Sequence, residues 1–198
     1  MTLQSEQDNI CMTEAEYLSS ELRSEVKREY FDGYIYAMTG ASANHARIIG
    51  NVFSEFRNHL KGMPCESFMA DMKVKAGKNY LYPDVVVDCG KIAGDEYFVI
   101  SPVVIVEVLS KSTRKNDTTK KLLYYLNLPT LQEYVLMEQE FVSIQVLRKS
   151  KHWTPEYYYL GDQVTFESIG LTLSVEAIYD RVDNNDMDEF RQTKPIIS

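Results

Sequence analysis

The stretch "VVIVEVLS" (residues 103–110) constrains the fold of this chain more than any other segment. It continues an apolar run that begins with "YFVISP", and such a run is typical of a strand buried on both faces rather than an exposed sheet edge. One acid interrupts it. Because side chains alternate along a strand, Glu107 shares a face with the apolar residues Ile105 and Leu109. The fold must therefore accommodate a carboxylate inside a central strand.

A second acid stands in a similar setting within "YLYPDVVVDC" (residues 80–89), where Asp84 follows Pro83 and precedes a valine run. Proline has no N–H, so strand pairing is interrupted beside this acid. A buried carboxylate is destabilising unless a cation or hydrogen-bond donors meet it. Two acids on adjacent strands would suit Mg²⁺, with a substrate phosphate completing the coordination. One alternative stays open: Asp84 would begin a strand and Glu107 would form a structural ion pair.

The segment after this strand predicts a helix over residues 115–127. Asp117, Lys121 and Tyr125 lie at intervals of four and share one face of it. If the helix folds back over the end of the strand, Lys121 can reach Glu107, hold an attacking water and neutralise charge on a phosphate. The alternative is a surface Asp117–Lys121 pair worth a few tenths of a kcal/mol, which leaves Glu107 unexplained.

Apolar periodicity and turn signals supply the other elements. They predict helices over 14–27, where Thr13 and Glu16 form a capping-box pattern, and over 42–60. Asp32-Gly33 marks one hairpin, and "MKVKA" with "YLYPDVVVD" suggests a second. Later segments indicate further strands and a short helix: "EYVLME", "FVSIQVLRKS", "WTPEYYYL", "QVTFES" and "LSVEAIYDRV". We expect an α+β (mixed α/β) fold with a central mixed sheet flanked by helices and an extra C-terminal β meander.

Length and composition favour one globular domain over residues 1–198, with residues 1–12 and 184–198 as flexible tails. Hydrophobic residues make up 44% and charged residues 25%, and no apolar run is long enough to span a membrane. The cysteines are three in number and widely spaced, which indicates neither a disulfide framework nor a zinc site. We expect a cytoplasmic protein with reduced cysteines.

The formal net charge of −8 argues against a general nucleic-acid binder, which would carry clustered Lys and Arg. The charge is uneven, however. From Glu107 to Tyr125 there are five basic residues and two acids, one of which is Glu107 itself. This basic strip would suit a local phosphate site, and it would equally suit a solvated loop.

Several segments, in this order and spacing, resemble the Uma-two family of restriction endonucleases, within the PD-(D/E)XK phosphodiesterase superfamily. The resemblance covers most of the chain and is carried by "EYFDGYIYAMTGASANHARIIGNVF", "YPDVVVD", "PVVIVEVLSKST", "NDTTKKLLYYLNLPTLQEYVLM" and "LTLSVEAIYDRV". It implies a restriction-endonuclease-like core and Mg²⁺-dependent hydrolysis of phosphodiester bonds in DNA.

By position, the resemblance implies that Asp84 is the aspartate of the PD motif and Glu107 the acid of the (D/E)XK element, both of them metal ligands. The sequence departs from the superfamily at Leu109, where a lysine would stand. In this family a lysine on the following helix replaces it, which points to Lys121 as the catalytic lysine. Lys120 is the fallback, although it lies about 100° round the helix from Lys121.

Four further residues are candidates for supporting roles. Asp117 would orient Lys121, and Glu29 matches an N-terminal acid that assists the metal in similar proteins; a surface ion pair explains Glu29 equally well. His45, in the first turn of the second helix, suits a cap or packing role better than a ligand role. Ser110 would hold the strand end or contact phosphate.

We therefore expect a divalent-metal-dependent DNA endonuclease that uses Mg²⁺, with Mn²⁺ as an alternative ion. A double-strand break made with one site per chain favours a homodimer. A catalytically silent nucleic-acid or protein interaction module on the same fold is the main alternative, and the net charge favours it. A hydrolase of small phosphoesters is a third possibility.

Overall fold

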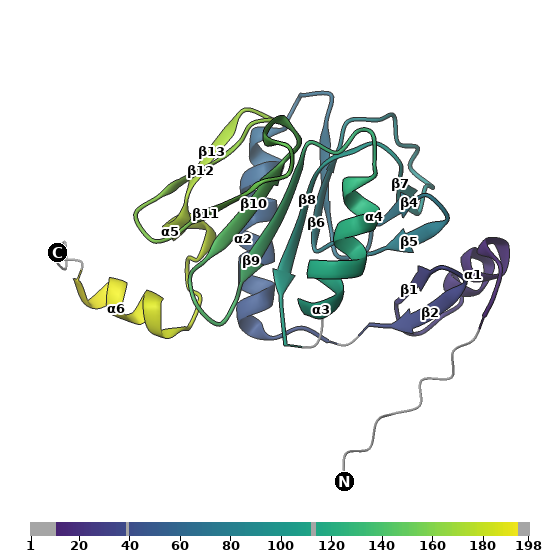
Figure 1. The fold of residues 1–198 in the computed structure, drawn as a ribbon, viewed down its shortest axis with the longest axis horizontal. Helices are drawn as coiled ribbons and strands as arrows, with labels where there is room; N and C mark the ends of the chain where they lie inside the picture. The colour runs from purple at the N-terminus through teal and green to yellow at the C-terminus, as the bar shows by residue number, and fades with distance from the viewer. Residues whose placement is uncertain (1–10, 39, 112–113, 194–198) are drawn as a thin grey trace, which may run out of the picture.

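The computed structural model describes residues 11–38, 40–111 and 114–193. Its centre is a six-stranded mixed sheet in the order β11–β10–β9–β8–β6–β3 (Figure 1). β8 runs parallel to β9 and antiparallel to β6, so the apolar run expected to be a central strand is an interior strand. The strands are β3 (Glu66–Met69), β6 (Val85–Asp88), β8 (Pro102–Leu109), β9 (Glu133–Glu138), β10 (Ile144–Arg148) and β11 (Pro155–Tyr158).

A five-stranded sheet in the order β2–β1–β5–β4–β7 stands beside the first (Figure 1). Asp32 and Gly33 both have positive φ and form the expected turn between β1 and β2. A separate hairpin, β12–β13, follows the meander of β9, β10 and β11. The strands are β1 (Arg28–Phe31), β2 (Tyr34–Ala37), β4 (Lys73–Ala76), β5 (Asn79–Leu81), β7 (Phe98–Val99), β12 (Gln163–Phe166) and β13 (Leu171–Ser174).

Helices cover both faces of the six-stranded sheet. In Figure 1, α2 lies behind the sheet and the run α3–η1–α4 lies in front. Thr13 and Glu16 form the expected capping box of α1. The helices are α1 (Glu14–Glu21), α2 (Ala43–His59), α3 (Arg114–Asn116), the π-helix η1 (Asp117–Lys121), α4 (Leu122–Leu126), the 3₁₀ turn η2 (Lys149–Lys151), α5 (Val175–Ile178) and α6 (Asn185–Thr193). The expected mixed α+β fold is confirmed.

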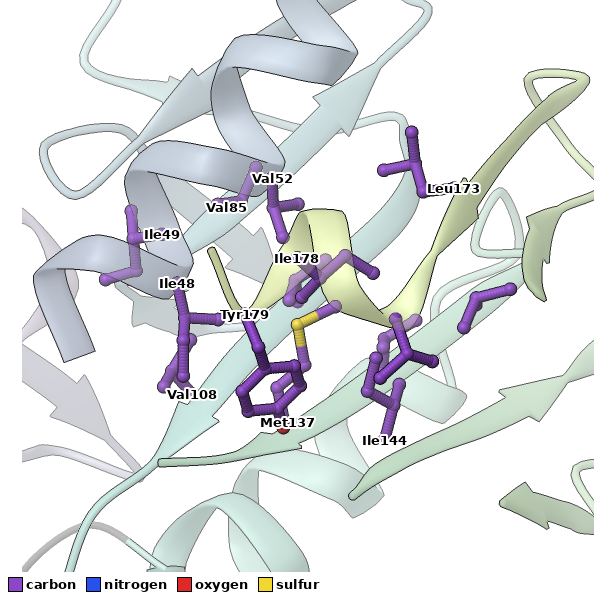
Figure 2. Packing of buried hydrophobic residues seen from close by; sticks show 14 of the residues in the cluster. Ile48, Ile49, Val52, Val85, Val108, Met137, Ile144, Leu173, Ile178 and Tyr179 are labelled. Atoms are coloured by element: carbon purple, nitrogen blue, oxygen red, sulfur yellow. The ribbon is translucent and has the colours of Figure 1, made fainter. Parts of the chain in front are cut away.

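The two faces of β8 belong to different parts of the core. Val108 packs in the cluster that includes Ile48 and Val52 of α2 (Figure 2). Leu109 packs in the opposite cluster with Tyr125 of α4. Each fully buried apolar side chain of this size contributes roughly 1.5–3 kcal/mol. Because side chains alternate along a strand, the acid before Val108 points to the α4 side.

The second predicted hairpin is wrong in its second arm. β5 ends at Leu81 and pairs with β4 as expected, but β6 begins at Val85 and belongs to the six-stranded sheet. Pro83 lies in the crossing between them, where it cannot continue the hydrogen-bonded ladder. The segment Tyr82–Asp84 therefore connects the two sheets.

The expectation of reduced cysteines without a disulfide is also wrong in this structure. Cys65 and Cys89 form a disulfide with a Cα–Cα distance of 4.0 Å. The cause is strand register: Glu66 pairs with Asp88, so the two cysteines face each other just beyond the ladder. Cys11 is a free, exposed thiol.

The expected C-terminal tail is a helix over much of its length. α6 occupies Asn185–Thr193, and Met187 is buried in the main core. Its place is fixed by the Asp186 carboxylate, which accepts a hydrogen bond from Val142 N at 2.7 Å. Residues 1–10 and 194–198 lie outside the described residues. No helix in the described part of the chain is long and apolar enough to cross a bilayer.

Candidate active site

Asp84, directly before β6, lies opposite Glu107 of β8. Val85 pairs with Val106 across β6 and β8, so the same register places Asp84 opposite Glu107 at the next position. Asp84 Oδ2 accepts a hydrogen bond from Val108 N at 2.6 Å. The Glu107 side chain is 3% exposed and that of Asp84 is 18% exposed. One acid is therefore inside the protein and the other lies at the rim.

Lys121 lies among three carboxylates. Its Nζ is 2.9 Å from Glu29 Oε1, 3.1 Å from Glu107 Oε1 and 3.3 Å from Asp117 Oδ1. Its side chain is 5% exposed. Lys120 is exposed instead, with its Nζ 5.5 Å from the centre of the Tyr36 ring. The geometry expected of Lys121 is present, whereas its catalytic role stays a prediction.

The helix that carries Lys121 contains a π turn. Asp117 and Lys121 are the first and last residues of η1, and both are buried. The hydroxyl of Thr118 donates to the Arg114 carbonyl, four residues back. π turns inside helices are often found at functional sites. Here the turn places the side chains of Asp117 and Lys121 together, next to the end of β8.

Glu29 reaches the site from the other sheet. It lies on β1, and its Oε1 accepts from Tyr82 N at 2.9 Å as well as facing Lys121. The Lys121 ammonium in turn donates to the Tyr82 carbonyl at 3.4 Å. Tyr82 belongs to the segment that connects the two sheets. The site is therefore built where the sheets meet, and Glu29 is part of a buried ion-pair network rather than a surface pair.

His45 faces Asp84 from the opposite side of the sheet. Its Nε2 is 3.3 Å from Asp84 Oδ2, at the N-terminal end of α2. The cap role considered for His45 belongs to Ser42 instead, whose hydroxyl accepts from His45 N at 3.2 Å. The His45 ring is thus free of a capping role and directed at an acid. The sequence placed His45 near a helix start, but it could not show which strand lay beside it.

The acids and bases of the cluster shift each other's titration. Burial raises the pKa of Glu107 well above its ordinary value; Lys121 opposes this rise, and the nearby carboxylates add to it. Burial lowers the pKa of Lys121, but the carboxylates led by Glu107 outweigh it and hold the net pKa well above the usual value. For His45, burial lowers the pKa, but the hydrogen bond and charge of Asp84 outweigh this effect, so the net pKa is raised.

The site holds more carboxylates than ammonium groups. The ammonium of Lys121 contacts three carboxylates, and a fourth, Asp84, adds its field at Glu107. Four carboxylates against one ammonium leave a formal excess of three negative charges. Oxygen donors of this kind are the ligands that Mg²⁺ and Mn²⁺ prefer, so the residues fit such an ion chemically. As they stand, no three described His, Cys, Asp or Glu side chains are close enough to hold a metal, and the ammonium occupies the centre of the cluster.

The remaining sequence candidates lie around this cluster. Ser110 follows β8, and its carbonyl accepts from Arg114 N at 3.0 Å, which holds the strand end to α3. Much of the predicted basic strip is already paired with acids. Arg114 donates to the Glu138 carboxylate through Nη1 and Nη2, and Lys111 Nζ lies 3.5 Å from Glu140 Oε2. The strip is therefore a set of ion pairs more than a free cationic surface.

The fold has a solved counterpart. The crystal structure of a protein described as a "putative nuclease belonging to DUF820" from Anabaena variabilis matches with a TM-score of 0.72. The match covers 85% of this chain and 97% of that one at 22% sequence identity, so it shows the shared fold. The protein therefore has the same mixed α+β fold as that crystal structure.

Sequence comparison identifies the family. Residues 14–176 match Uma2, described as "Putative restriction endonuclease", and the chain belongs to this family. The uncharacterized protein slr1290 of Synechocystis sp. is 39% identical over 169 residues, covering 83% of this chain and 89% of that protein. The uncharacterized protein sll1609 of the same organism is 36% identical over 137 residues, covering 65% and 75% respectively.

Proposed function

We propose that this chain is a divalent-metal-dependent DNA endonuclease that hydrolyses phosphodiester bonds. The observation that carries the proposal is the buried cluster of Glu29, Glu107 and Asp117 around Lys121, with Asp84 at its rim. An excess of buried negative charge is costly without a bound cation. The family's description supports the nuclease class.

Asp84 and Glu107 would hold Mg²⁺ or Mn²⁺. Such an ion, when bound, neutralises phosphate charge and acidifies a water molecule. The Lys121 ammonium would orient the attacking water and stabilise the negative charge that develops on the phosphate. Glu29 and Asp117 act through Lys121: their carboxylates keep it protonated and fix its position, so they are positioning residues.

The proposed partner is DNA, bound by a homodimer. A chain with one such site cuts one strand at a time, so a two-fold pair of chains would make a double-strand break. The alternative is a catalytically silent interaction module on the same fold. The ion pairs of Arg114 and Lys111 favour this alternative, because they occupy cations that would otherwise meet phosphate.

A nicking assay on supercoiled plasmid tests the proposal. We expect nicking with Mg²⁺ or Mn²⁺, loss of it in EDTA, and a decrease of at least about 100-fold for Asp84→Asn and for Lys121→Met. Lys120→Met, one residue away on the exposed side of the helix, is the matched control and should retain nicking. Inactive wild-type protein that still binds DNA would support the silent module instead.

A further inference from the structure

His45 brings an imidazole to the acidic site, and the hydrolysis proposed above has no step that needs it. The residue is 9% exposed, and its Nε2 lies 3.3 Å from Asp84 Oδ2. Within the described part of the chain, no group meets its buried Nδ1 in good hydrogen-bond geometry, although the ring also lies near the Val108 backbone. Leaving a buried polar atom unsatisfied costs about 1–3 kcal/mol. A histidine kept for packing alone would not be directed at a site aspartate in this way.

The distance between the two side-chain atoms suits shared ligation. Two donors at about 2.1 Å from one ion, at angles between octahedral and tetrahedral, are roughly 3.0–3.4 Å apart. The observed 3.3 Å separation of Nε2 and Oδ2 lies in this range. A strong charge-assisted hydrogen bond would be shorter, at about 2.7–2.9 Å.

The surroundings of Asp84 support the same conclusion. Its Oδ2 is held by Val108 N at 2.6 Å, so the carboxylate has a fixed orientation on the strand end. Asp84 is also the most exposed of the site acids, at 18% of its side chain. Lys121 occupies the interior end of the cluster, beside Glu107. An ion would therefore meet the cluster from the rim, at Asp84 and His45.

We propose that His45 is a nitrogen ligand of the metal site and makes that site prefer a divalent first-row transition metal to Mg²⁺. Imidazole suits transition-metal ions such as Zn²⁺, Ni²⁺ and Fe²⁺. Mn²⁺ also prefers oxygen donors, but as a transition-metal ion it accepts an imidazole more readily than Mg²⁺, which takes oxygen ligands. The site would then combine the carboxylates of Asp84 and Glu107 with one imidazole. This inference rests on the metal site of the proposed function, and it replaces the expectation that Mg²⁺ is the favoured ion.

A positioning role is the competing explanation. If His45 only orients Asp84, its loss should weaken the binding of every divalent ion by the same factor. If His45 is a ligand, its loss should weaken the binding of Mn²⁺ selectively and leave the binding of Mg²⁺ nearly unchanged. His45→Gln separates the two roles, because the Gln amide can still donate to Asp84 but supplies no imidazole.

The experiment measures binding of Mn²⁺ and Mg²⁺ by calorimetry on the full-length protein without DNA. For His45→Gln we expect the ratio of the two dissociation constants to fall about tenfold, mainly through weaker Mn²⁺ binding. His59→Gln is the matched control. His59 ends the same helix, and its Nε2 contacts the Ile169 carbonyl at 2.7 Å, away from the site. Circular dichroism checks that both variants are folded.

Electron spin echo spectroscopy on the Mn²⁺-loaded protein gives a direct second readout. Wild type and His59→Gln should show ¹⁴N modulation from a bound imidazole, and His45→Gln should not. Equal weakening of both ions, or ¹⁴N modulation that survives in His45→Gln, would overturn the inference. Plasmid nicking without ¹⁴N modulation would overturn it while leaving the nuclease proposal standing. Modulation without nicking would overturn the nuclease proposal alone.

Discussion

Leu109 stands where the superfamily pattern would place a lysine, and its surroundings show that a lysine would not fit. The residue is 4% exposed and packs in the cluster that contains Ile105 and Tyr125. The site's ammonium comes instead from Lys121 on the helix, which reaches Glu107 at 3.1 Å. The positive charge of the site therefore comes from a helix residue, Lys121, and the side chain of Leu109 on the strand is part of the hydrophobic core.

Leu109→Lys should lower the free energy of unfolding by about 3 kcal/mol or more, because it buries a charge and disrupts apolar packing. Urea unfolding measures this. Leu109→Met, which conserves volume, should cost less than about 1.5 kcal/mol. The lysine variant should also fail to increase plasmid nicking. A Leu109→Lys protein as stable as wild type would mean that the side chain reaches the acids after all.

Glu107 should make the stability of the metal-free protein depend on pH. Burial and neighbouring carboxylates raise its pKa in the folded state well above its ordinary value of 4.5, so the folded state holds this proton more tightly than the unfolded state does. The free energy of unfolding therefore falls as pH rises above that value. Glu107→Gln removes this loss, and in EDTA its stability relative to wild type should be greater at pH 8 than at pH 4.

Urea unfolding at several pH values checks this prediction. Glu55→Gln, at an exposed position on α2, controls for the loss of a carboxylate. A difference between wild type and Glu107→Gln that does not change with pH would contradict the raised pKa.

At the scale of elements, the π turn and the crossing between the sheets decide where the site forms. A regular helix over 115–127 also places Asp117 and Lys121 on one face, so the sequence pattern predicted their pairing. It gave no signal of the π turn, because such turns are rare single-turn insertions within α-helices. The crossing at Tyr82–Asp84 supplies both backbone groups that meet Glu29 and Lys121.

The disulfide gives an element-scale prediction. Cys65 and Cys89 connect the ends of β3 and β6, with a sequence separation of 24. Closing a loop of this length is worth about 3 kcal/mol through the unfolded state. The Cys65→Ser, Cys89→Ser double variant should lose about that much stability. Thiol titration of the denatured protein should find only Cys11 reactive before reduction, and Cys65 and Cys89 as well after it. Three reactive thiols without reductant would contradict the bond.

At the scale of the whole molecule, the sequence predicted what depends on local pattern. It predicted the capping box of α1, the Asp32-Gly33 hairpin and the interior strand β8, because each is determined by neighbouring residues. The sequence pattern could not predict contacts between segments that are far apart in the chain. Examples are the Cys65–Cys89 bond, the approach of His45 to Asp84 and the entry of Glu29 from a second sheet. These depend on strand register and on how the sheets meet.

The carboxylates of the site predict that a bound metal ion increases the stability of the whole fold. Four carboxylates repel one another across the junction of the two sheets, and an ion that binds only the folded state stabilises it by mass action. With Mn²⁺ at ten times its dissociation constant, the gain is about 1.4 kcal/mol, or an increase in Tm of roughly 3–6 °C. Asp84→Asn should abolish the increase. Asp71→Asn is the matched control, because its side chain is 81% exposed and pairs with Lys27 outside the site. Differential scanning calorimetry in EDTA and in millimolar Mn²⁺ measures the change. A Tm that does not respond to the ion in wild type would remove the metal site, and with it the proposed hydrolysis.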